Sequence, residues 1–266
     1  MTQAHAPPAA KSGPSTERCP ERTPPTGGKD AAGARGNLLL TCLPEPVWQR
    51  WQPQLEAADL PLGQVLCEPG ERLTHVLFPT TAIVSLMYLT ENGSSAEIAV
   101  IGNEGMVGTW LTMGGDSTPS RDVVCSAGHG FRLSSSVLVE EFNRSTAVMH
   151  LVLRYTQALL TQIAQMAACN RHHSLEERLC HWLMLRLDRL ESNHITVTQE
   201  LIASMLGVRR EGVTKAAGRL QKAGLIAYHR GHIEVLDCKG LEARSCECYR
   251  VVKNEYDRLL PVQIAT

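Results

Sequence analysis

The segment Thr198–Lys239 constrains the fold of this chain most, because two short helical patterns are joined there by a tight glycine turn. Thr198–Met205 has apolar residues at helical spacing behind a threonine that suits an N-cap. Arg210–Ala223 has one apolar and one charged face, and Leu206-Gly207-Val208 separates the two helices. A helix, a glycine turn and a basic second helix predict a helix-turn-helix, whose second helix fits the DNA major groove.

Two strand patterns follow this motif. Leu225–Tyr228 and Ile233–Leu236 flank a turn at His229–His232, which predicts a wing. The candidate DNA-contacting residues are polar or basic side chains of the second helix and the wing: Arg209, Arg210, Glu211, Thr214, Lys215, Arg219 and Arg230.

The charge distribution favours DNA binding over the alternative of a solvated helix pair. From Arg209 to Arg230 there are six basic residues and one acidic residue, a net charge of +5. Residues 37–170 contain six basic and twelve acidic residues, a net charge of −6, although the whole chain carries only −1. A basic patch on an otherwise acidic protein is typical of a surface that neutralises phosphates.

The composition, with 43% hydrophobic and 20% charged residues, is typical of a soluble globular protein with two modest domains. No apolar run approaches the roughly 18 residues that a membrane span needs. Residues 1–36 are rich in Pro, Gly, Ala, Ser and Thr, which predicts a disordered tail rather than a signal peptide. We therefore expect a cytoplasmic protein without a membrane partner.

Nine cysteines are scattered along the chain without a C-x-x-C motif, and the spacing of Cys246-Glu-Cys248 does not suit a tetrahedral zinc pair. We therefore predict buried thiols, no metal site and no cofactor, with a redox-sensing thiol at Cys246 or Cys248 as the alternative. No arrangement of nucleophile, base and orienting group indicates an enzyme, and no catalytic residues are predicted.

Short strand patterns punctuated by turns extend from Leu38 to about Phe142, after a short helix at Trp48–Leu55. Their spacing predicts a small β-barrel or jelly roll. The candidate strands are Gln64–Cys67, His75–Phe78, Ala82–Leu89, Ala96–Ile101, Val123–Ser126 and Gly130–Leu133.

Ser145–Cys169 lacks Gly and Pro and predicts one long helix. A heptad seam follows it, which favours a two-stranded dimer, with the polar Gln162 suited to setting the register. A core helix packed on the β-domain remains the alternative. The seam residues are Val148, Val152, Tyr155, Leu159, Gln162, Met166 and Cys169. Further helices are expected at Arg171–Leu190 and Gly240–Leu260.

The order of barrel, long helix and winged helix-turn-helix resembles the Crp–Fnr superfamily of bacterial transcription factors over about residues 38–240. The strongest match is T-V-T-Q-E-L-I-A-S-M-L-G-V-R-R-E-G-V-T-K, and L-G-Q-V-L-C-E-P-G-E in the barrel is a weaker one. The resemblance implies an α+β fold with an N-terminal cyclic-nucleotide-binding-like β jelly roll. The expected boundaries are a tail at 1–36, the sensor domain at 37–144, a dimerisation helix at 145–170, the winged helix-turn-helix at 171–240 and a C-terminal helix at 241–266.

The resemblance also implies roles for the second helix. Glu211 would accept a hydrogen bond from a cytosine amino group, while Arg210 and Lys215 would reach guanine or phosphate. Lys215 stands where the family usually has Arg, and lysine lacks the bidentate fork that favours guanine. Arg209 and Thr214 would contact phosphates, and Arg230 would reach the backbone from the wing.

The effector motifs depart further from the family. Members that bind cyclic AMP have a Gly-Glu and an Arg-Ser or Arg-Thr, whereas this chain has I-G-N-E-G-M-V-G and T-P-S-R-D. Glu104 and Arg121 are the candidates for an anionic effector, but cyclic AMP is not favoured, and the glycines suit barrel turns. An iron–sulfur cluster is not expected, because the N-terminal region has only Cys19 and Cys42.

Together these patterns predict a sequence-specific transcription regulator that binds palindromic double-stranded DNA as a homodimer. RNA polymerase and an unknown small-molecule or redox effector would be its other partners. The alternatives are a cyclic-nucleotide or small-anion binding module, and a thiol-, redox- or metal-dependent regulator.

Overall fold

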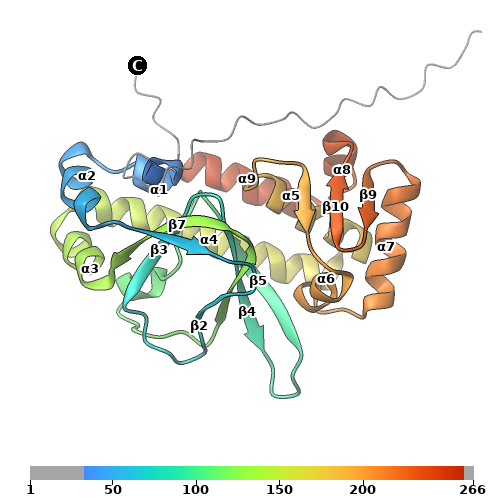
Figure 1. Ribbon diagram of the computed structural model, residues 1–266, viewed down its shortest axis with the longest axis horizontal. Helices are drawn as coiled ribbons and strands as arrows, with labels where there is room; N and C mark the ends of the chain where they lie inside the picture. The colour runs from blue at the N-terminus through green and yellow to red at the C-terminus, as the bar shows by residue number, and fades with distance from the viewer. Residues whose placement is uncertain (1–32, 261–266) are drawn as a thin grey trace, which may run out of the picture.

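The computed structural model describes residues 33–260, which form a β-sheet domain, a long helix along it, and a mixed helical and stranded region beyond (Figure 1). Short helical elements precede the sheets: η1 (Gly33–Gly36), α1 (Leu38–Thr41), α2 (Glu45–Trp51) and η2 (Gln52–Gln54). The disordered tail was expected to extend to residue 36, but residues 33–36 form η1, in which Ala34 is fully buried. The rest of that tail, residues 1–32, lies outside the described residues.

Two antiparallel sheets make up the β-domain, with strand orders β2-β6-β4-β5 and β1-β7-β3. Their core includes Phe78, Ile83 and Leu133, each at most 1% exposed. This arrangement agrees with the expected barrel or jelly roll, and all six candidate strands are present. The strands are β1 (Glu56–Leu60), β2 (Val65–Cys67), β3 (His75–Pro79), β4 (Ile83–Leu89), β5 (Ser95–Ile101), β6 (Arg121–Ser126) and β7 (Gly128–Ser134).

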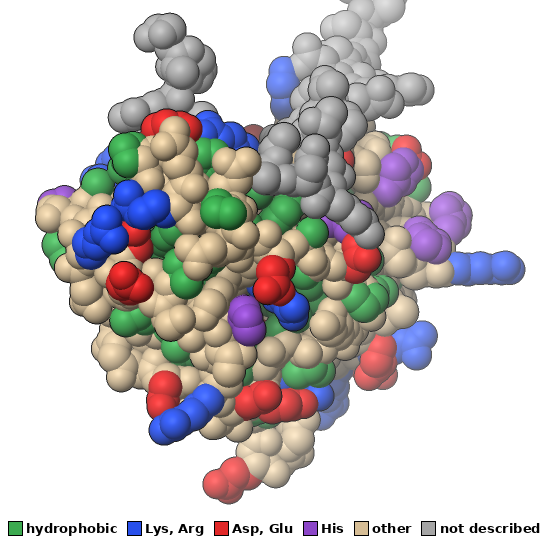
Figure 2. Space-filling view, turned by 60° about the vertical axis from the view of Figure 1, so that its left-hand side comes forward, with side chains coloured by type: hydrophobic (Ala, Val, Ile, Leu, Met, Phe, Trp, Pro, Cys, Tyr) green, Lys and Arg blue, Asp and Glu red, His purple; other side chains and the backbone are tan. Residues whose placement is uncertain are grey.

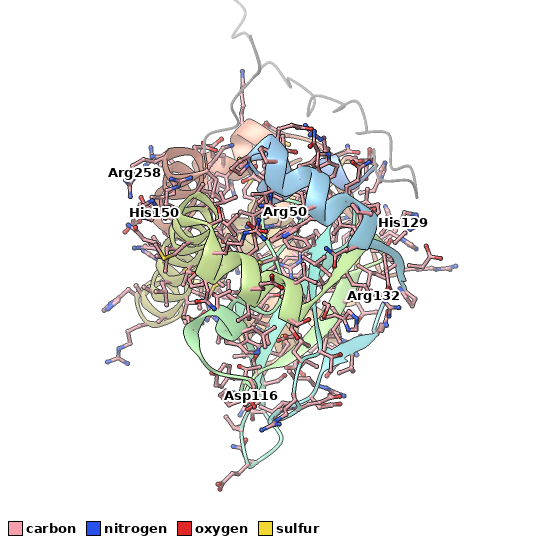
Figure 3. The ribbon with its side chains drawn as sticks, turned by 90° about the vertical axis from the view of Figure 1, so that its left-hand side faces the viewer. Arg50, Asp116, His129, Arg132, His150 and Arg258 are labelled. Atoms are coloured by element: carbon pink, nitrogen blue, oxygen red, sulfur yellow. The ribbon has the colours of Figure 1, made fainter. Side chains whose placement is uncertain are left out.

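Strand β1 and helix α3 (Ser135–Arg144) were not predicted. The sequence of β1, Glu-Ala-Ala-Asp-Leu, has residues that rarely favour strands, and pairing with β7 supplies its hydrogen bonds. Helix α3 is joined to α2 by an ion pair at 2.6 Å between Arg50 and Glu141. Figure 3 shows Arg50 between these two helices.

Helix α4 (Thr146–His172) is the long helix expected from the sequence, capped by the Ser145 side chain, which accepts a hydrogen bond from the Val148 backbone N–H. It lies beside α9 (Glu247–Leu259), and the Tyr155 and Tyr256 ring centroids are 6.5 Å apart (Figure 1). All seven side chains of the predicted seam are at most 6% exposed within this one chain. The predicted seam is therefore wrong as a dimer surface, because the chain's own elements cover it.

Gln162 has a role within the chain rather than in a dimer register. Its Oε1 accepts a hydrogen bond from the Val100 backbone N–H at 2.7 Å, and its Nε2 donates to the Tyr256 hydroxyl at 3.2 Å. The polar side chain thus connects α4 to β5 and to α9, and it satisfies a backbone donor that would otherwise be buried without a partner.

The region after α4 contains α5 (Leu175–Leu187), β8 (His194–Thr196), α6 (Gln199–Leu206), α7 (Arg210–Lys222), β9 (Ile226–His229), β10 (His232–Val235) and α8 (Cys238–Ala243). The single C-terminal helix expected from the sequence is two helices, α8 and α9, separated at Arg244–Cys246. Residues 261–266 lie outside the described residues. No helix within residues 33–260 has the length and apolar character needed to cross a membrane.

Candidate nucleic-acid interface

Helices α6 and α7 form the predicted helix-turn-helix. Thr198 caps α6, because its side chain accepts a hydrogen bond from the Leu201 backbone N–H at 3.2 Å. Gly207 ends α6 in the left-handed conformation at φ 62°, and the Val208 N–H donates to the Ala203 carbonyl at 2.9 Å. This is the hydrogen bond of a glycine-terminated helix, so the turn needs glycine at this position.

Helix α7 has one apolar face and one charged face, as the sequence predicts. Its buried face consists of Val213, Ala216, Ala217 and Leu220, each at most 2% exposed. Arg209, Arg210, Glu211 and Lys215 are exposed on the opposite side, and none of these four forms an ion pair with another residue of the described part of the chain. This face is free to meet a partner.

The wing is a hairpin of β9 and β10 with a two-residue turn, and β8 pairs with β10 as a third strand. Arg230 and Gly231 occupy the turn with φ of 44° and 87°. Two positive φ values identify a type I′ turn, which matches the twist of the strands. Arg230 is therefore held at the tip, beside a hollow of about 630 Å³ that Arg210 and Thr214 of α7 also line.

Two of the candidate DNA-contacting residues already have partners in the protein. Arg219 forms an ion pair with Glu176 of α5, whose other oxygen contacts Arg244 at 3.2 Å. The Thr214 hydroxyl donates to Gln199 Oε1 at 2.7 Å. Arg219 is thus directed toward α5, and the candidates that remain exposed without an ion pair within residues 33–260 are Arg209, Arg210, Glu211, Lys215 and Arg230.

The structure does not bring Glu104 and Arg121, the candidates for an anionic effector, together. Arg121 pairs with Met87, near the C-terminal end of β4. Ile101, the last residue of β5, pairs with Val84 near the N-terminal end of β4, and Glu104 follows it three residues later. Arg121 makes an ion pair at 2.9 Å with Glu68, and Glu104 makes one at 2.8 Å with Arg189, two residues after the end of α5. Each charge is engaged within the chain at a separate place.

The glycines of I-G-N-E-G-M-V-G are explained by close packing. A Cβ at Gly105 would lie 2.4 Å from the Tyr155 hydroxyl, which donates a hydrogen bond to the Met106 carbonyl. A Cβ at Gly102 would lie 2.8 Å from the Arg189 side chain. The loop therefore provides room for α4 and for the Arg189 side chain beyond α5, as the structural interpretation of these glycines predicts.

Asp122, next to Arg121, is fully buried in β6, where it accepts a hydrogen bond from Ser120 at 3.0 Å. Burial raises the pKa of Asp122 from 3.8 to about 6. Because the folded pKa is the higher one, its contribution to stability is fully present below about pH 4 and is lost as the pH rises through about 6.

Asp122→Asn is therefore expected to raise the free energy of unfolding at about pH 8 by about 3 kcal/mol, with no gain near pH 4. Urea unfolding of both proteins at the two pH values measures this difference. An equal gain at both would show that charge burial is not its cause.

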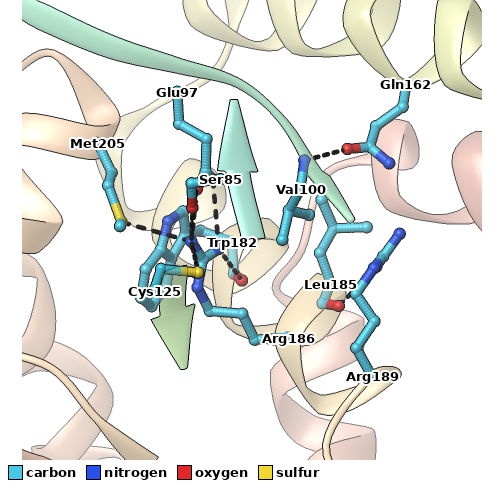
Figure 4. A network of polar contacts seen from close by, with 10 residues as sticks. All are labelled: Ser85, Glu97, Val100, Cys125, Gln162, Trp182, Leu185, Arg186, Arg189 and Met205. Carbon is cyan, nitrogen blue, oxygen red and sulfur yellow. Dashed lines mark hydrogen bonds and ion pairs between the residues drawn. The ribbon is translucent and has the colours of Figure 1, made fainter. Parts of the chain in front are cut away.

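A buried polar network joins the helix-turn-helix region to the β-domain (Figure 4). Arg186 of α5 contacts both carboxylate oxygens of Glu97 on β5, at 2.6 and 3.3 Å. Ser85 donates a hydrogen bond to the same carboxylate, and the Arg186 guanidinium lies 3.5 Å from the centroid of the Trp182 ring. Arg186 and Glu97 are 2% and 1% exposed, so this pair is removed from solvent. Sequence reasoning missed it, although Arg186 interrupts an otherwise apolar run, L-M-L-R-L.

The charges on the β-domain side are of both signs. Figure 2 shows acidic and basic side chains interspersed over the surface of the β-domain side. Several are paired, including Arg132 with Glu56 and Arg72 with Asp116. The net positive charge is thus concentrated at α7 and the wing.

The expectation of no metal site considered only cysteines that are neighbours in sequence. The structure places Cys169 and His173, at the end of α4, against Cys246 and Cys248, at the start of α9. These four residues form a group with metal-ligand chemistry.

Comparison with known proteins agrees with this geometry. A family model described as the Crp-like helix-turn-helix domain matches residues 177–244. The matched segment contains α6, α7 and the wing. No curated protein matches the chain.

Solved structures share the fold. A transcriptional regulator of the CRP family from Thermus thermophilus is 19% identical, with a TM-score of 0.59, covering 71% of this chain and 96% of that one. FixK2 from Bradyrhizobium japonicum is 16% identical, with a TM-score of 0.62, covering 72% and 98%. The c-di-GMP responsive global regulator CLP from Xanthomonas campestris is 13% identical, with a TM-score of 0.55, covering 72% and 99%. The predicted resemblance and fold class are confirmed: the chain shares the fold of solved Crp–Fnr proteins, and residues 177–244 match the Crp-like helix-turn-helix model.

Proposed function

We propose that this chain is a sequence-specific transcription regulator that binds a two-fold symmetric DNA site as a homodimer. The observation that carries the proposal is the open polar face of α7 beside the Arg230 wing, in a Crp-like helix-turn-helix domain. Arg210, Glu211 and Lys215 are exposed there, and none has an ion-pair partner among residues 33–260.

The side chains divide by chemistry into base readers and phosphate contacts. A carboxylate accepts hydrogen bonds, so Glu211 suits the amino group of cytosine, and Arg210 suits the two acceptors of guanine. Arg209, Lys215 and Arg230 supply charge for phosphates, which sets affinity but not sequence preference.

Glu211→Ala is expected to cost about 1–3 kcal/mol on the cognate site and to relax specificity at one base pair. Lys215→Ala is expected to weaken all DNA binding and to reduce the dependence of log K on log salt by about 1. Titrations of cognate and random duplex at several salt concentrations measure both effects. Arg144→Ala, which removes an exposed arginine at the end of α3, is the charge-matched control. Equal loss on both duplexes would show that Glu211 does not read a base.

The dimer is proposed to form through the face of α4 that its own chain leaves open. Leu153 and Leu160 are 47% and 60% exposed and seven residues apart, and the small Ala164 and Ala167 continue this stripe at heptad spacing. His150, on the same stripe, lies at the outer edge of the molecule (Figure 3). A second copy would cover these residues and place two α7 helices on one DNA site.

The proposed roles keep the boundaries expected from the sequence, with residues 37–144 as sensor, 145–170 as dimerisation helix, 171–240 as DNA-binding domain and 241–266 as a C-terminal segment. A cavity of about 420 Å³ supports control at the junction, because Glu104, Arg189 and Tyr256 of three separate segments line it. An effector bound there would act only through its differential affinity for the two arrangements of the domains. RNA polymerase is the protein partner that such a regulator would act upon.

A further inference from the structure

We propose that this chain binds one Zn²⁺ ion in a tetrahedral site formed by Cys169, His173, Cys246 and Cys248. Their ligand atoms all lie within 4.8 Å of one another. The Sγ atoms of Cys169 and Cys246 are 3.4 Å apart, and Cys248 Sγ is 3.6 Å from His173 Nδ1. A tetrahedron with Zn–S bonds of about 2.3 Å and Zn–N bonds of about 2.0 Å has edges of about 3.8 and about 3.6 Å. The observed separations are therefore close to those that a bound ion requires.

Two helix ends hold these ligands. Cys169 lies in the last turn of α4, and His173, four residues later, is its C-cap on the same side. Cys246 is the N-cap of α9, and Cys248 lies in the first turn of that helix. The packing of α9 along α4 brings the two pairs together, although 77 residues separate Cys169 from Cys246.

Neighbouring groups orient the ligands as they do in known metal sites. His173 directs Nδ1 at the cluster, and its Nε2 lies 3.4 Å from Glu247 Oε1. A carboxylate on the second ring nitrogen is the usual support for a histidine ligand. His181, which is 1% exposed, places Nδ1 3.5 Å from Cys169 Sγ, where an N–H would donate to a thiolate.

The kinds of ligand atom indicate which metal ion the site would bind. Three sulfur atoms and one imidazole suit Zn²⁺, whereas Mg²⁺ and Ca²⁺ prefer oxygen ligands. Four protein ligands fill a tetrahedral ion, which is typical of a structural site. The compact group has room for a single ion between its atoms and none for the iron and sulfide atoms of a cluster. On binding, the three thiols lose their protons to solvent and His173 stays neutral, so the occupied site carries a net charge of −1.

The position of the site suggests what the ion stabilises. His173 directly precedes Ser174, the N-cap of α5, whose capping box with Glu177 begins the helix that leads into the DNA-binding region. The three cysteines are at most 4% exposed and pack against one another. A bound ion would tie the end of α4 to the start of α9 at this junction.

Titration of the full chain, reduced and freed of metal by a chelator, with Co²⁺ as a spectroscopic substitute for Zn²⁺ tests the proposal. We expect one equivalent to bind, with thiolate-to-metal charge-transfer bands and the intense visible absorption of a tetrahedral ion. Zn²⁺ should displace Co²⁺ and raise the unfolding temperature. Cys248→Ser should lose the tight site, while Cys67→Ser, which alters a buried cysteine of β2, should bind as the native chain does.

Glu247→Gln provides a variant that does not threaten folding, because the Glu247 side chain is 68% exposed. It should keep the stoichiometry and weaken Co²⁺ binding by about 10–100-fold. A reduced chain that binds no Co²⁺, or a Cys248→Ser variant that binds it as tightly as the native chain, overturns the proposal. So does a reversible Cys169–Cys246 disulfide in a chain that takes up no metal, which would make this group a redox pair.

Discussion

Arg186→Met is expected to lower the free energy of unfolding by about 3–5 kcal/mol, because it leaves the Glu97 carboxylate buried without its partner. Glu97 is 1% exposed, and its remaining hydrogen-bond donor would be Ser85. Methionine keeps most of the length of the side chain, so the loss measures charge pairing more than volume. Chemical unfolding followed by circular dichroism gives the free energy.

Two further variants show whether the loss comes from leaving a buried charge unpaired. Replacing both partners, with Arg186→Met and Glu97→Leu together, should cost less than Arg186→Met alone, because no unpaired charge remains. Arg132→Met, which breaks the surface pair with Glu56, should cost at most about 1 kcal/mol, since both side chains are more than half exposed. A similar loss in Arg132→Met and Arg186→Met would contradict the role assigned to the buried network.

Leu160→Glu is expected to convert a dimer into a monomer and to weaken binding to a two-fold DNA site by roughly 100-fold or more. Leu160 is 60% exposed in the single chain, so the substitution leaves the monomer intact. Two DNA-binding units in one dimer gain from high effective concentration, and a monomer loses that gain. Light scattering and titration with one duplex measure the two effects.

Leu62→Glu is the matched control, because Leu62 is similarly exposed at 49% but lies in the loop between β1 and β2, away from α4. It should leave both the mass and the DNA affinity unchanged. If the Leu160→Glu protein were still a dimer of full affinity, another surface would have to form the dimer.

Local patterns account for what the sequence predicted well. The strands of the β-domain, α4 and the helix-turn-helix follow from spacing within a few residues, and Thr198 and Gly207 lie at the helix ends that their chemistry favours. Strand β1 was missed because its residues do not favour strands and only β7 makes it one.

The features that the sequence did not predict depend on residues that are far apart in the chain. The seam on α4 has dimer spacing, yet β5 and α9 cover it, and periodicity alone does not distinguish these neighbours from a second chain. In the same way, Arg186 meets Glu97 across 89 residues, and the Cys246-Glu-Cys248 pair gains Cys169 and His173 only after α9 packs on α4. A spacing rule limited to nearby cysteines therefore predicted no metal site.

If α7 reads DNA sequence as half of a symmetric dimer, selection of bound fragments from a random duplex library should recover a symmetric site. We predict a consensus with two inverted half-sites centred about 10 base pairs apart, or one helical turn. Each half-site should contain a position that loses its preference when the selection is repeated with Glu211→Ala. A library that yields no consensus, or one with a single half-site unaffected by Glu211→Ala, would show that α7 does not read DNA in this way.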